Sequence, residues 1–93
     1  MSNIKTNNFL SEAEYKAMLD EIREQKRSAK KEMKRGCYNM AGMYYGDAAA
    51  LCRVLGHIND GDFKRAAETA QGQDTAARDN VPSAIWDKLS KYM

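Results

Sequence analysis

Apolar residues recur every three or four positions between residues 15 and 33. They are Tyr15, Met18, Leu19, Ile22, Ala29 and Met33. This spacing places them on one face of an α-helix. Ser11 and Glu14 form the S-x-x-E pattern of a capping box, and Leu10 and Tyr15 are placed for the hydrophobic staple that often accompanies it. The pattern therefore predicts a helix that begins just after Ser11.

Helical periodicity continues beyond Gly36 as far as Ile58. The apolar positions of this second segment are Met40, Tyr44, Ala48, Leu51, Cys52, Leu55 and Ile58. Lys34 and Arg35 before a glycine are typical of a helix C-terminus, and Asn39 is a suitable N-cap for a new helix. A helical hairpin is therefore favoured. The alternative is one long helix through the glycine, because the two apolar arcs stay in phase and an interior glycine costs only about 1 kcal/mol.

Two shorter helices are predicted after the turn sequence NDGD at residues 59–62. Asp62 is placed to cap the first of them, which ends at Gly72. Its buried face is expected to hold Phe63, Ala66, Ala67 and Ala70. The second opens at Pro82 or Ser83. Its apolar side is expected to hold Ile85, Trp86, Leu89 and Tyr92.

No segment alternates with a period of two residues, so no β-strand is predicted. The expected fold class is all-α, a small helical bundle built on a long helical hairpin with two shorter C-terminal helices. We expect a single helical domain over residues 11–93, preceded by a polar, flexible N-terminal arm over residues 1–10. A chain of 93 residues forms only a thin core, so association into a homo-oligomer is also expected.

The composition is that of an ordinary folded chain, with 43% hydrophobic and 30% charged residues. Two cysteines, Cys37 and Cys52, are too few for a disulfide framework. The N-terminal residues lack the apolar stretch of a signal peptide, and no window approaches ~18 consecutive apolar residues. These features predict a reducing, cytoplasmic location and no membrane partner.

Small residues gather on one face of the second helix. Gly46 and Ala49 lie within about 60° of Gly42 on a helical wheel. The same arc carries four polar side chains, Arg35, Asn39, Arg53 and His57, and it is flanked on one edge by Tyr38 and Tyr45. We call Gly42, Gly46 and Ala49 the glycine seam. The favoured interpretation is a close helix–helix contact, within the chain or across an oligomer; the alternative is a strip that binds an anionic or aromatic ligand.

A basic run precedes the seam, with seven basic and two acidic side chains in residues 23–35. Arg23, Arg27, Lys30 and Lys34 share one arc of the first helix, and we call them the basic stripe. Residues 12–22 are acidic instead. The helix macrodipole favours acidic residues near the start of a helix and basic residues near its end, so this charge distribution is explained by a solvated helix face without any partner. The functional interpretation is attraction to phosphate or to an acidic protein surface.

Catalytic patterns are missing from the sequence. His57 is the only histidine, and it points away from Cys52 on a helix, so neither a Cys–His pair nor local zinc ligation is expected. There is no P-loop, G-x-S-x-G or H-E-x-x-H motif. We therefore expect no cofactor, no metal and no enzymatic activity. Trp86 is expected to dock the last helix on the hairpin, or else to be an exposed anchor for a partner.

The sequence thus predicts a non-enzymatic binding module, a small oligomeric protein-interaction or inhibitor protein. Its small size and well-capped helices resemble those of many bacteriophage accessory proteins, which often bind and inhibit a host factor, and this resemblance implies the host cytoplasm as the location. The alternative is a protein that binds nucleic acid or a small anionic nucleotide through the basic stripe and the glycine seam. Salt dependence separates these functions, because phosphate binding weakens steeply as salt rises.

Overall fold

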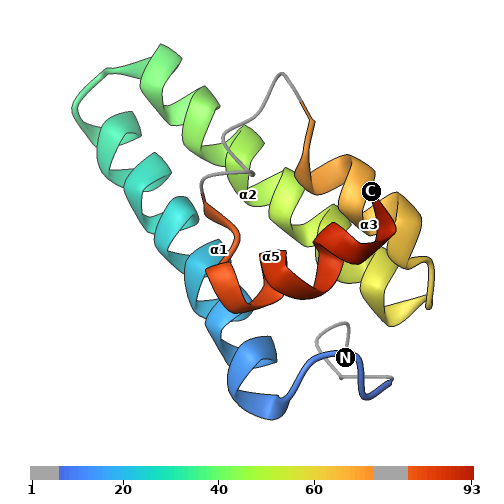
Figure 1. Ribbon diagram of the computed structural model, residues 1–93. Coiled ribbons are helices and arrows are strands. Elements are labelled where there is room, and N and C mark those ends of the chain that lie inside the picture. Colours follow the sequence, from blue (N-terminus) through green and yellow to red (C-terminus); the bar gives the residue numbers. More distant parts are fainter. Residues whose placement is uncertain (1–6, 73–79) are drawn as a thin grey trace.

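The computed structural model describes residues 7–72 and 80–93, which contain helices and no β-strand (Figure 1). The helices are α1 (Glu12–Lys34), α2 (Tyr38–Asn59), α3 (Phe63–Ala70) and α5 (Ser83–Leu89), followed by a 3₁₀ turn, η1 (Ser90–Tyr92). The predicted all-α bundle, built on a long helix pair with shorter C-terminal helices, is confirmed.

The start of α1 has the predicted capping box. The amide of Glu14 donates to Ser11 Oγ at 3.1 Å, and the amide of Ser11 donates to Glu14 Oε1 at 2.8 Å. Two backbone donors that the helix leaves unpaired are thereby satisfied by side chains three residues apart. The position of this helix start is therefore a local property of the sequence.

The long helices form a hairpin and not one continuous helix. Gly36 has φ of 80°, a left-handed conformation that suits glycine and ends α1. The amide of Cys37 donates to the Glu32 carbonyl at 2.9 Å and that of Gly36 to the Met33 carbonyl at 3.1 Å, which is a complete Schellman motif. The turn is so short that α2 begins at Tyr38. The prediction of an N-cap at the following asparagine is therefore wrong, because that residue already lies in the first turn of α2.

The turn between α2 and α3 uses the same geometry. Gly61 has φ of 78°, and the amide of Asp62 donates to the His57 carbonyl at 2.9 Å. The carboxylate of Asp62 then accepts from the amide of Arg65 at 3.2 Å, as predicted for the cap of α3. The amide of Asp62 thus pairs with a carbonyl at the end of α2, and its carboxylate caps the start of α3.

The buried arc of α2 differs from the predicted one. Cys52 and Met40 are exposed, whereas Ala41, Ala50 and Val54 are buried. The reason is that α2 contacts α1 on one side and α3 on the other, so its buried arc is wide and its centre is set by both neighbours. A helical wheel drawn from the apolar residues alone does not show that α3 also packs against α2.

The short helices cover only part of the hairpin. A helix of eight residues such as α3 is about 12 Å long, whereas α1, with 23 residues, is about 35 Å long. Figure 1 shows α3 and α5 packed against the end of the hairpin where α1 begins and α2 ends, away from the turn at Gly36. We call the covered end the base and the end near the turn the tip.

The segment before α1 belongs to the packed base. The Phe9 ring stacks on Phe63 with centroids 4.1 Å apart, and Leu10 is 1% exposed. Asn7 Nδ2 donates to the carbonyl of Ile58 at 2.6 Å. Residues 7–10 of the predicted flexible arm therefore pack on the base, because two adjacent apolar side chains anchor this segment. Residues 1–6 of the predicted arm lie outside the described residues.

Candidate binding surface

One face of the hairpin is covered by no element among the described residues. Residues 80–83, which lead into α5, line a groove with Ala17, Glu21 and Glu24 of α1, so the C-terminal helices occupy that side. On the opposite side, side chains of α1 and α2 meet without any described element over them. We call this the open face. Its exposed residues are Arg23, Lys26, Lys30 and Lys34 of α1 with Tyr38, Gly42, Tyr45, Gly46, Ala49, Cys52, Arg53 and Gly56 of α2.

The basic stripe is exposed, and its net charge is greatest toward the tip. Arg23 lies 3.6 Å from Asp20, and Arg27 lies 2.9 Å from Glu24. All four of these side chains are at least half exposed, so the pairs contribute little energy. Lys26, Lys30 and Lys34 form no ion pair with any other described residue. The positive charge on this side of α1 is therefore available to an anionic partner.

The glycine seam is not packed within the described part of the chain. Gly42, Gly46 and Ala49 are all exposed, and a Cβ built on either glycine would meet nothing within 4 Å. The predicted helix–helix contact is therefore not made by the described residues, because the seam points away from both α1 and α3. A contact across two chains stays a prediction. Tyr38 and Tyr45 are 67% and 42% exposed, so the seam is an open strip with aromatic side chains on one edge.

The polar residues predicted around the seam do not converge on one point. Arg35 Nη1 pairs with Glu32 Oε1 at 3.2 Å beside the turn, and Asn39 is exposed in the first turn of α2. Arg53 lies about 22 Å farther along the helix axis than the start of α2. His57 is half-buried near the turn into α3. Two arginines so far apart cannot hold one small phosphate group together, so this arrangement does not favour a compact nucleotide.

Exposed methionines at the tip were not predicted as surface residues. Met33 is 47% exposed, Met40 42% and Met43 60%, although the first two continue the apolar arcs of the sequence. These side chains lie beyond the reach of the short helices, so nothing in the described residues covers them. The signal that could have found them is helix length, because two helices of about two turns cannot cover a hairpin of six.

Trp86 does not lie on the open face. It is half-buried on α5 and packs against the hydrophobic core beside Ile85 and Leu89, which are fully buried. Its position agrees with the expected docking of the last helix on the hairpin. A role as an interface residue for a partner finds no support in this packing.

The described ranges contain neither a metal-binding cluster nor a membrane-spanning helix. No group of three or more histidine, cysteine, aspartate or glutamate side chains within residues 7–72 and 80–93 is arranged to hold a metal ion. None of the helices in those ranges combines the length and apolar content that crossing a membrane requires. Comparisons of the chain with models of known protein families, with curated proteins and with solved structures each give no match.

Proposed function

We propose that this protein is a non-enzymatic binding module that uses the open face and the tip to bind an acidic helix of another protein. The observation that carries the proposal is the charge of the open face, which presents five basic side chains; among the described residues only one of the five, Arg23, lies near a carboxylate, that of Asp20 at 3.6 Å. The only carboxylate within α2 belongs to Asp47, which is 9% exposed. A surface of one sign attracts and orients a partner of the opposite sign.

The shape of the seam supports a helix as the bound element. Gly42, Gly46 and Ala49 follow one another at intervals of three or four along α2, so a helix laid against them can approach the backbone closely. Tyr38 and Tyr45 then provide contacts along one edge. A helix in a groove is a common mode of recognition, in which side chains at helical spacing anchor the complex.

The residue types support a protein partner over nucleic acid. Tyrosine, methionine and arginine are enriched in the buried centres of protein interfaces, and exposed methionines suit adaptable apolar contacts. The tip offers Met33, Met40 and Met43 for such contacts. A nucleic-acid backbone would use the lysines but would leave these apolar side chains without a partner.

The same charges disfavour a second copy of this chain on the open face. Two identical faces would bring Lys30, Lys34 and Arg53 against the same residues of the other copy, and like charges across an interface are repulsive. We therefore assign the face to a different protein, which fits the role of an inhibitor or accessory protein in a reducing cytoplasm.

The test is site-specific photo-crosslinking in the source cell. A photoreactive phenylalanine analogue replaces Tyr45 in one protein and Lys64, which is exposed on α3, in a control. We expect a crosslink from position 45 to an acidic helical segment of another protein. Charge reversal of Lys30 and Lys34 to glutamate should reduce it at least about tenfold, whereas reversal of Lys64 and Lys91 should not.

The other outcomes overturn the proposal. A crosslink from position 45 to a second copy would assign the face to a homo-oligomer. A crosslink to nucleic acid, with binding that falls steeply between about 50 and 200 mM salt, would assign it to phosphate recognition. Equal yields from positions 45 and 64 would show that the open face is only a solvated surface.

A further inference from the structure

A cleft of about 290 Å³ lies between α1 and α2 on the open face, toward the base. Its apolar lining comes from Leu19, Ile22 and Leu55. The cleft exists because α2 presents two small residues, Cys52 and Gly56, at the level where α1 passes. A Cβ built on Gly56 would meet nothing within 4 Å, so this part of the helix–helix junction is unfilled.

The size and lining of the cleft suit a small apolar body. An engineered apolar cavity of about 150 Å³ is large enough for benzene, so this cleft holds a group about twice that size. Ile22 and Leu55 are 6% and 5% exposed and form its floor. Asn59 adds one polar side chain to the lining, but water against Ile22 and Leu55 finds few hydrogen-bond partners, which favours its replacement by a hydrocarbon chain or ring.

The rim adds positive charge on one side. Arg23 and Lys26 lie three residues apart on α1 and both line the cleft. Arg23 has only a long, exposed contact of 3.6 Å with Asp20, and Lys26 forms no ion pair with any other described residue. An arginine beside a lysine is well suited to a carboxylate, since the guanidinium can donate two parallel hydrogen bonds to its two oxygens.

We propose that this cleft binds an amphipathic monocarboxylate, with the apolar part against Leu19, Ile22 and Leu55 and the carboxylate at Arg23 and Lys26. The cleft shares Arg23 and Lys26 with the open face, but it lies toward the base and does not use Lys30, Lys34 or Tyr45, on which the crosslinking test of the protein partner depends. Failure of one proposal therefore leaves the other standing.

The test uses decanoate below its micelle concentration as the probe and decanol as a matched uncharged control. Binding is measured by amide chemical-shift changes in the full-length protein. We expect decanoate to shift amides around Leu19, Lys26 and Gly56 and to bind at least about tenfold more tightly than decanol. Lys26→Glu should remove that preference, because it places a negative charge beside the carboxylate.

A substitution that fills the cleft, compared with the same substitution outside it, gives the most direct test. Gly56→Leu should block the cleft and weaken decanoate binding at least about tenfold, whereas Gly42→Leu makes the same change on the same helix outside the cleft and should leave binding unchanged. Circular dichroism and thermal unfolding are used to check that both variants are folded. Equal binding to the two variants, or equal binding of decanol and decanoate to the wild type, would overturn the proposal.

A second readout covers the case in which Gly56→Leu disturbs the fold. Cys52 is exposed at the edge of the cleft, so its alkylation rate reports occupancy in a Cys37→Ser background. We expect decanoate to slow the alkylation of Cys52 and decanol to have a weaker effect. No slowing by decanoate at concentrations that shift the amides would place the probe elsewhere and refute the site.

Discussion

The base and the tip of the hairpin are made by the same two helices, yet they differ in what covers them. At the base, Met18 and Leu51 are fully buried under α3, α5 and the segment that carries Phe9. At the tip, Met43 is 60% exposed although it is as apolar as Met18. Burial here depends on whether a second layer of structure reaches the residue. The tip therefore keeps apolar surface that is free to contact another molecule.

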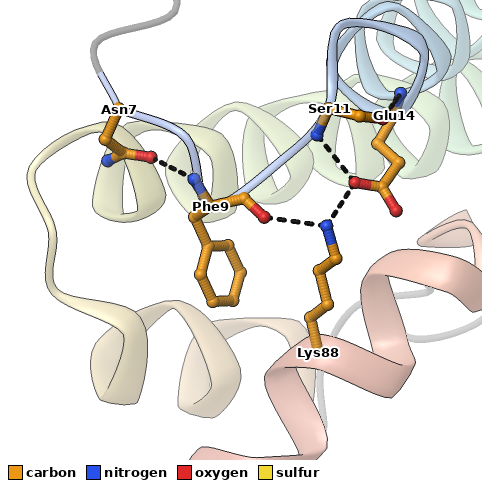
Figure 2. A network of polar contacts seen from close by, with 5 residues as sticks. All are labelled: Asn7, Phe9, Ser11, Glu14 and Lys88. Carbon is orange, nitrogen blue, oxygen red and sulfur yellow. Dashed lines mark hydrogen bonds and ion pairs between the residues drawn. The ribbon is translucent and has the colours of Figure 1, made fainter.

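The ion pairs of the base and the tip differ in how far apart their partners lie in the sequence. Figure 2 shows Lys88 of α5 donating to the Phe9 carbonyl, at 2.8 Å, and to the carboxylate of Glu14. This contact joins segments more than 70 residues apart in the chain and ties the N-terminal segment to the last helix. Toward the tip, the pairs of Arg27 and Arg35 reach only three residues back along α1. Polar contacts at the base thus hold the fold together, whereas those near the tip leave its surface accessible.

Truncation of one apolar residue in each region tests this contrast most strongly. Leu51→Ala removes a fully buried side chain at the base and should lower the free energy of unfolding by about 2–5 kcal/mol. Met43→Ala, on the same helix near the tip, should change it by less than about 0.5 kcal/mol. Urea unfolding followed by circular dichroism measures both. A comparable loss in Met43→Ala would mean that the tip is covered in solution, and a loss that grows with protein concentration would identify a second copy as the cover.

The pH dependence of stability tests the polar contact at the base. The pKa of Glu14 is lowered, first by the hydrogen bond from Lys88 and then by that from the Ser11 amide. The folded state therefore binds fewer protons there than the unfolded state. The stabilisation contributed by the ionised Glu14 is fully present above the ordinary pKa of a glutamate and is lost as the pH falls through the lowered pKa.

Glu14→Gln removes the charge but keeps a side-chain acceptor for the capping box. At pH 7 it should be less stable than the wild type by up to about 1 kcal/mol, and the difference should shrink toward zero as the pH falls below about 4. Glu12→Gln, in the same helical turn and exposed, is the control and should show a smaller change. A difference between wild type and Glu14→Gln that stays constant with pH would contradict the assigned role of the charge.

Two glycine substitutions give the smallest expected effects, with opposite signs. Gly46→Ala in the glycine seam should raise the free energy of unfolding by about 0.5–1 kcal/mol, because alanine is the better helix former and its Cβ meets nothing. Gly36→Ala should lower it by about 1 kcal/mol, because φ of 80° strains any residue with a Cβ. Thermal unfolding measures both. Destabilisation by Gly46→Ala would indicate that another chain already packs on the seam.

Sequence reasoning favoured a solvated basic stripe and a packed glycine seam, whereas both are exposed in the structure, and it could not show that Arg23, Lys30 and Lys34 of the stripe share one face with the seam. It also put Met40 and Cys52 on the buried side of α2, where the structure has Ala50 and Val54 instead. A helical wheel records which residues share a direction. It does not record how many neighbours surround the helix or where those neighbours end.

The sequence by itself determined the start of α1, the turns that follow α1 and α2, and the start of α3. The capping box at Ser11, the glycines at 36 and 61 and the cap at Asp62 all act over three to six residues, and all are found in the structure. Only the tertiary structure decided which half of the hairpin is covered, that the segment around Phe9 packs at the base, and that a cleft lies beside Gly56. The reason is the range of the interactions involved: capping satisfies hydrogen bonds within one turn, whereas burial requires surfaces that the chain brings together over tens of residues.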